Sequence, residues 1–119
     1  MLIESIYATE NGKTYPYLKV LDKIAPALSL PLNSEVMIAG IVQKNEIRYT
    51  KRKKPYRRIT IEYRDGTYTH NVFEKVDAKK FDICLFFAEI DSYNNAKELR
   101  IRKVEKLIDT EEYKRRFLN

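Results

Sequence analysis

Positive charge in this sequence gathers in one short stretch. Residues 44–58 read KNEIRYTKRKKPYRR and hold eight Lys or Arg residues against a single acid, Glu46. The whole chain has 23 bases and 17 acids, so the remainder holds 15 bases against 16 acids and is nearly neutral. Tyr49 and Tyr56 flank the densest run of cations. Since cations bind the phosphates of a single-stranded nucleic acid and aromatic rings stack on its bases, the stretch predicts a site for such a strand.

The overall composition agrees with a polyanionic partner. The 119 residues carry a formal net charge of +6, and the pI is about 9.4, as is common for nucleic-acid-binding domains. No apolar run approaches the length of a membrane span, and the first residues do not resemble a signal peptide. We therefore expect a cytoplasmic protein with no membrane partner.

Residue types that carry out catalysis or hold metals are sparse. His70 is the one histidine and Cys84 the one cysteine, so neither a His cluster for a metal nor a disulfide is expected. The carboxylates are scattered, and no phosphate-binding loop or nucleophile motif is present. We predict a non-enzyme with no catalytic residue, no metal and no cofactor. His70 is expected to be structural, and Cys84 a small buried residue.

Strand patterns fill the middle of the chain. Residues 35–49 form a long β-rich run with Gly40 near its centre, which indicates a bulge or a sharp bend. Apolar and polar residues alternate over 56–63, and a turn follows at Asp65-Gly66. Three further strands are expected over 67–74, 82–91 and 98–108. A long strand that bends can serve two sides of one small barrel. The fold class expected for 34–108 is mainly β, a five-stranded Greek-key barrel of the OB type.

Both ends of the chain predict extensions of this barrel. Asn11-Gly12 favours a β-hairpin over about 2–20, and a short helical turn follows before Pro31, so 1–33 is expected to pack on the barrel. At the other end, Asp109 and Glu112 have the spacing of a helix N-cap, which predicts a short helix over 109–119.

The stretch 35–107 resembles the OB-fold domains of the anticodon-binding group and of the bacterial replicative polymerase alpha-subunit group, and with them single-stranded DNA-binding proteins. The matching features are Gly40 in the first strand, the Asp65-Gly66 turn, the Val72-Phe73 pair and Ala88 in the fourth strand. The helix usual between the third and fourth strands of that group is reduced here to residues 75–81. The resemblance implies binding of a single strand across the second and third strands and between two flanking loops, without catalysis.

The predicted binding site combines the basic loop, the outward face of the second and third strands, and the turn near residue 93. Phe73 is left open between an exposed stacking platform and a core residue, because a bulge would reverse its facing. The predicted nucleic-acid-binding residues are Arg48, Tyr49, Lys51, Arg52, Lys53, Lys54, Tyr56, Arg58, Thr60, Thr69, Asn71, Phe73, Tyr93 and Lys97.

The partner expected from these residues is single-stranded DNA or RNA, with DNA preferred and a role in replication, recombination or repair. One alternative is a protein-interaction adaptor, because OB barrels also bind proteins. Its contact elements would be the edge of the N-terminal hairpin or the C-terminal helix. A second alternative is a binder of duplex or structured RNA that inserts the basic hairpin into a groove.

Overall fold

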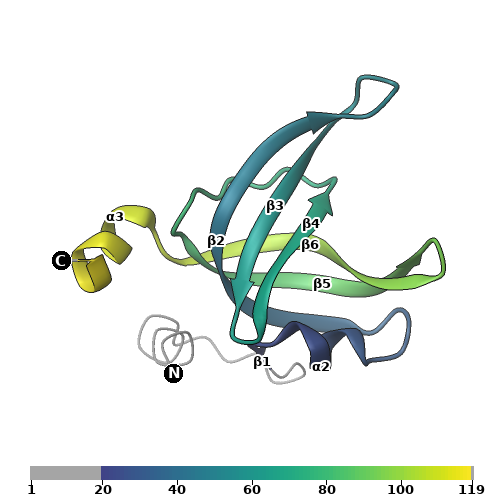
Figure 1. Cartoon of the computed structure of the whole chain (residues 1–119), viewed down its shortest axis with the longest axis horizontal. Helices are drawn as coiled ribbons and strands as arrows, with labels where there is room; N and C mark the ends of the chain where they lie inside the picture. Colours follow the sequence, from purple (N-terminus) through teal and green to yellow (C-terminus); the bar gives the residue numbers. More distant parts are fainter. Residues whose placement is uncertain (1–19, 119) are drawn as a thin grey trace.

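A computed structural model describes residues 20–118, and five long strands dominate it (Figure 1). The strands are β2 (Glu35–Tyr49), β3 (Pro55–Tyr63), β4 (Gly66–Val72), β5 (Ile83–Tyr93) and β6 (Ala96–Ile108). A two-residue strand β1 (Val20–Leu21) and a helix α2 (Ile24–Leu28) precede them, and α3 (Thr110–Tyr113) continues into a π-helical turn (Lys114–Leu118). The mainly β fold class predicted from the sequence is confirmed.

The long strand β2 serves both halves of a barrel. Its first half, Glu35 to Ile41, pairs antiparallel with β5, and its second half, Ile41 to Tyr49, pairs antiparallel with β3. The hydrogen-bonded order is β4-β3-β2-β5-β6, and β4 also packs against β6. Five strands in this order form a partly open Greek-key barrel of the OB type.

Gly40 was expected to mark a bulge or a sharp bend in β2. The register between β2 and β5 is continuous through Gly40, and the bulge in β2 falls later, between Val42 and Lys44. Of the bulge or sharp bend expected at Gly40, the bulge is therefore wrong, while β2 does change its pairing partner from β5 to β3 beside this glycine, at Ile41. A Cβ atom at position 40 would lie 2.4 Å from Cγ2 of Ile61, so glycine is present because β3 crosses this point closely.

Apolar residues lie on both sides of the sheet. The barrel interior is filled by residues such as Ile38, Ile61 and Phe86, each fully buried. A second cluster on the other side of β2 and β5 includes Met37 and Leu85. Cys84 is buried in the interior cluster as expected, and desolvation raises the pKa of its thiol to about 12.

Two carboxylates fix the short helices. Asp65, in the β3–β4 turn, accepts hydrogen bonds from the backbone amides of Ile24 (2.8 Å) and Ala25 (3.0 Å) and so holds the start of α2. Asp109 accepts a bond of 2.9 Å from the amide of Glu112, which confirms the predicted N-cap. The hairpin expected over 2–20 falls almost wholly outside the described residues. Within them, no helix is long and apolar enough to cross a membrane.

Candidate nucleic-acid interface

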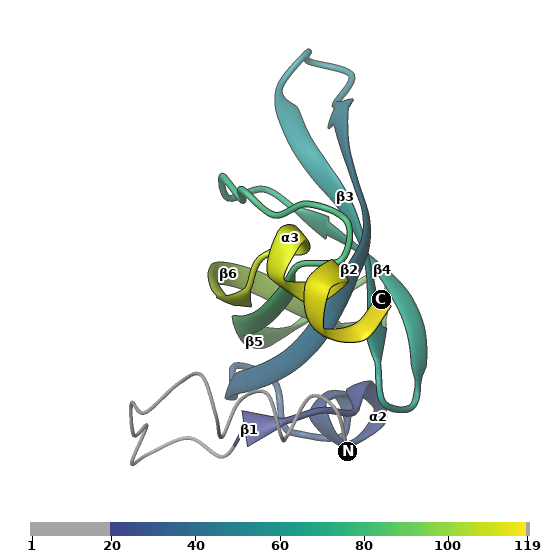
Figure 2. The same ribbon diagram turned by 90° about the vertical axis from the view of Figure 1, so that its left-hand side faces the viewer.

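The basic stretch forms a two-stranded arm, defined here as residues 44–58, which extends β2 and β3 beyond the barrel (Figure 2). Its tip is an ordered turn. The amide of Lys53 donates to the carbonyl of Thr50 (2.8 Å), the amide of Thr50 donates to the carbonyl of Lys54 (2.9 Å), and the hydroxyl of Thr50 accepts from the amide of Lys54 (3.1 Å). All four cations of the tip, residues 51–54, are exposed. The fold thus presents four cations on one closed turn.

The pairing of β3 with its neighbours sorts the predicted residues by face. Arg48 lies opposite Tyr56 on β2 and β3, while Arg58 and Thr60 lie opposite Asn71 and Thr69 on β3 and β4. The hydroxyls of Thr60 and Thr69 are 3.0 Å apart. This outer face of the arm therefore continues onto β4. Because side chains alternate along a strand, the inner face carries a different set, which consists of Asn45, Ile47, Tyr49 and Arg57. Tyr49 thus lies on the opposite face from most of the predicted residues.

The exposed Phe73 and the half-buried Tyr56 form an aromatic pair. Phe73 is 63% exposed, and its ring is stacked on that of Tyr56 at a centroid distance of 5.3 Å and an interplanar angle of 25°. The alternative of a core residue is thereby excluded for Phe73. Beside the pair is a cavity of about 280 Å³, lined by Ile47, Pro55, Tyr56, Arg57, Phe73, Glu74 and Lys75. The pair offers a flat apolar surface next to Arg57, as a stacked base requires.

Charge compensation differs along the arm. Glu46 forms ion pairs with Lys44 and with Arg48 (2.8 Å). Hydrogen bonds from Lys44 and Arg48 lower the pKa of Glu46 to about 2, so it stays ionised and offsets part of their charge. Among the described residues, no carboxylate is within ion-pair distance of the four tip cations, of Arg57 or of Arg58. Within the arm, the unpaired charge is therefore concentrated at the tip and near the start of β3.

The β5–β6 turn lies on the same side of the molecule as the tip of the arm, at the right of Figure 1. Asn94 and Asn95 have positive φ angles of 51° and 65°, which suits their role as turn-formers. Tyr93 is 66% exposed. Lys97 donates to the carbonyl of Leu30 (2.6 Å), so its ammonium ties the turn to the segment after α2. Of the two predicted residues in this turn, Tyr93 is therefore more accessible to a ligand than Lys97.

His70 belongs to the barrel wall rather than to the interface. Its Nε2 is 2.7 Å from the hydroxyl of Tyr63, and burial lowers the pKa of the imidazole to about 4. His70 is therefore neutral at pH 7. Over residues 20–118, no group of three or more His, Cys, Asp or Glu side chains could hold a metal ion.

A second set of cations lies next to the arm and was not among the predicted binding residues. Lys75, Lys79 and Lys80 follow β4, and Lys79 and Lys80 share a hollow of about 440 Å³ with Arg57 and Lys44. The available signal was three lysines within KVDAKKF. Because this segment lies well downstream of the basic stretch in sequence, only the fold brings the two together.

Comparisons with known proteins find a likeness in fold only. No family model matches the chain, and no curated protein matches it. The chain is similar to the solved structure of the second OB-fold domain of replication protein A from Methanococcus maripaludis. The two are 12% identical, the match covers 68% of this chain and 91% of that one, and the TM-score is 0.47. The resemblance to the anticodon-binding and polymerase groups stays a prediction, and the OB-type fold follows from the strand order.

Proposed function

We propose that the protein binds single-stranded nucleic acid, with single-stranded DNA as its ligand in replication, recombination or repair, and that it acts without catalysis. The observation that supports this most directly is the arm. Four exposed cations lie at its tip, with no carboxylate partner among the described residues, and the aromatic pair of Phe73 and Tyr56 lies close behind the tip. Cations and stacking surfaces side by side are the two elements of single-strand binding.

The aromatic pair favours a single strand over a duplex. Bases in a duplex are already stacked and paired, so Phe73 would find no free base face there, whereas an unpaired strand offers one at every nucleotide. A duplex would engage the cations alone. We therefore expect the preference for single strands to come from the pair and the salt dependence to come from the tip.

Fluorescence anisotropy of labelled 30-mers tests the proposal. Single-stranded DNA, single-stranded RNA and duplex DNA are compared from low to near-physiological salt. If the four tip cations engage phosphates, the affinity for a single strand should fall by about three powers of ten per tenfold rise in salt, from a slope of about 0.7 per phosphate. Tighter binding to duplex, or no binding to any of the three at low salt, would contradict the proposal. The second outcome would favour the adaptor alternative.

Phe73→Ala is expected to weaken binding of single-stranded DNA. Loss of one stacking platform costs roughly 1–3 kcal/mol, or about 5-fold to 150-fold in affinity. Since the Phe73 side chain is 63% exposed, the melting temperature should barely change. Anisotropy at fixed salt measures the loss, and Phe73→Trp serves as the control because it restores an aromatic face. Unchanged affinity in Phe73→Ala would show that the ring does not stack on a base.

A further inference from the structure

The connector, residues 73–82 between β4 and β5, runs along the inner face of the arm. It passes behind β2 and β3 in Figure 1. Its lysines at positions 75, 79 and 80 are all exposed, whereas Val76 and Ala78 between them are buried in the barrel interior. The alternation of anchored and exposed residues directs the three lysines away from the core.

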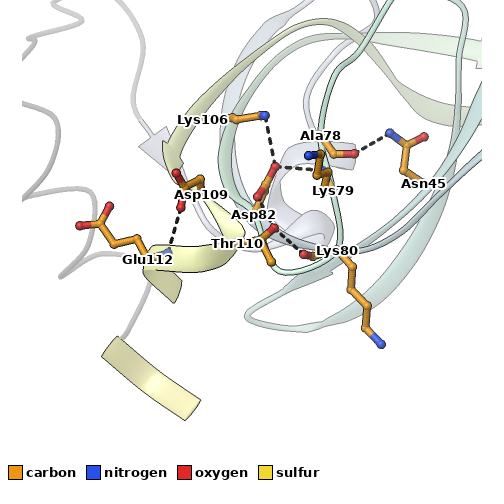
Figure 3. A network of polar contacts seen from close by, with 9 residues as sticks. All are labelled: Asn45, Ala78, Lys79, Lys80, Asp82, Lys106, Asp109, Thr110 and Glu112. Carbon is orange, nitrogen blue, oxygen red and sulfur yellow. Dashed lines mark hydrogen bonds and ion pairs between the residues drawn. The ribbon is translucent and has the colours of Figure 1, made fainter. Parts of the chain in front are cut away.

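The backbone of the connector is fixed from several sides (Figure 3). The side-chain amide of Asn45 donates to the carbonyl of Ala78 (2.7 Å), and the hydroxyl of Thr110 donates to the carbonyl of Lys80 (2.8 Å). Asp82, only 1% exposed, accepts from the amide of Lys79 (2.9 Å), and its Oδ1 lies 2.6 Å from the hydroxyl of Thr110, whose one hydrogen is shared between Lys80 and Asp82. The lysines are thus carried by a backbone that does not have to be ordered when a ligand binds.

A hollow separates the connector from the arm. It has a volume of about 440 Å³ and is lined by Gln43, Lys44, Asn45, Arg57 and residues 76–80. Arg57 also lines the cavity of about 280 Å³ beside the aromatic pair, so the two hollows adjoin at this side chain. The Oδ1 atom of Asn45, in the wall of this hollow, is buried and has no hydrogen-bond partner in the described part of the chain. A buried acceptor of this kind is normally satisfied by a water or a bound group.

The inner face of the arm and the connector carry the apolar and cationic side chains that bind a single-stranded nucleic acid. Ile47 and Tyr49 are 49% and 63% exposed and offer apolar surface. Within the described part of the chain, Arg57, Lys75 and Lys79 have no ion-pair partner, and the ammonium of Lys80 lies over the ring of Phe81 at 5.0 Å. Asp77 is the one acid that lines the larger hollow.

We propose that the groove between the inner face of the arm and the connector is a second phosphate-binding segment for the same nucleic-acid strand. The strand would pass from the tip, over the aromatic pair, past Arg57, and along Lys75, Lys79 and Lys80. Tyr56 lies on the outer face, so the strand would cross from that face to the inner one at the cavity lined by both Tyr56 and Arg57. From Arg57 onward it follows the inner face and not the outer face that carries Arg58. This inference rests on the proposed function, since it names the course of the strand that the tip binds.

The test replaces Lys75, Lys79 and Lys80 together with Ala in the full chain. At 0.1 M salt, affinity for a single-stranded 30-mer is expected to fall about 100-fold, and the salt slope by about 2, from roughly 0.7 per phosphate. The matched control replaces the exposed lysines Lys23, Lys103 and Lys114. It removes the same charge and should change affinity only a few-fold. A loss of structure would not lower the salt slope selectively, and melting curves identify it.

Variants of two neighbouring arginines distinguish a nucleic-acid strand on the inner face of the arm from one on the outer face. Arg57 and Arg58 are adjacent on β3 but lie on opposite faces of the arm. Arg57→Ala is expected to weaken binding about 5-fold at 0.1 M salt, by the same rule, and Arg58→Ala to weaken it less. The inference is overturned if Arg58→Ala costs more than Arg57→Ala, or if the connector variant matches its control while the wild type binds. Absence of binding by the wild type would instead overturn the proposed function itself.

Discussion

Replacing Lys51, Arg52, Lys53 and Lys54 together with Ala is expected to lower the affinity for a single-stranded 30-mer by two to three powers of ten at 0.1 M salt. Each phosphate neutralised on a single strand contributes about 0.7 to the salt slope, which is roughly a factor of five at that salt concentration. All four side chains are exposed on a turn held by backbone hydrogen bonds, so their removal should leave the fold intact. Anisotropy titrations over a range of salt measure both affinity and slope.

Two controls make the result specific to the tip. Replacing Lys23, Arg100, Lys103 and Lys114 with Ala removes the same charge from other exposed positions and should cost only a few-fold. Changing the three tip lysines to Arg keeps the charge and should keep the affinity. Unchanged binding in the four-alanine variant, with a normal melting curve, would contradict a role for the tip. A protein partner still captured, independently of salt, by a chain lacking 50–55 would then favour the adaptor alternative.

Local patterns predicted the elements of the barrel because these depend on short-range rules. Alternation over 56–63 placed Ile59, Ile61 and Tyr63 inward, and all three are buried. The facing of Phe73 was left open because a bulge would reverse it. The β3–β4 pairing has no such bulge, but Phe73 lies one position beyond the end of β4. Beyond the last paired residues of a strand, alternation no longer fixes the direction of a side chain. The side chain of Phe73 is instead oriented by its stacking on the ring of Tyr56.

The groove beside the connector could not be predicted because distant residues build it. Asn45 reaches Ala78 over 33 positions, and Thr110 reaches Asp82 over 28. In the sequence, Asp82 indicated only the start of a strand, whereas in the fold it is a buried acceptor that holds the connector. Asp65 was likewise expected only to form a turn, yet it also caps α2 from about 40 positions away. These roles depend on tertiary contacts, which produce no repeating pattern in the sequence.

Gly40→Ala is expected to destabilise the protein by roughly 2–3 kcal/mol, as overpacking of a core commonly does. The added Cβ would lie 2.4 Å from Cγ2 of Ile61, 3.2 Å from the backbone carbonyl oxygen of Glu62 and 3.2 Å from the ring of Tyr63. Ile61 is β-branched and fully buried, so it has little freedom to move aside. Urea unfolding followed by circular dichroism measures the change in the free energy of unfolding.

A double-mutant cycle with Ile61→Ala identifies the cause of this loss. Ile61→Ala alone should cost roughly 2–5 kcal/mol through the cavity it leaves. The two changes together should cost at least ~1 kcal/mol less than their sum, because removing Cγ2 of Ile61 gives the new methyl group room. Additive effects would show that Gly40 matters for its backbone freedom and not for the close crossing of β2 and β3. A Gly40→Ala protein that remains folded at low temperature should bind a single strand as the wild type does, since residue 40 contacts the barrel wall and not the arm.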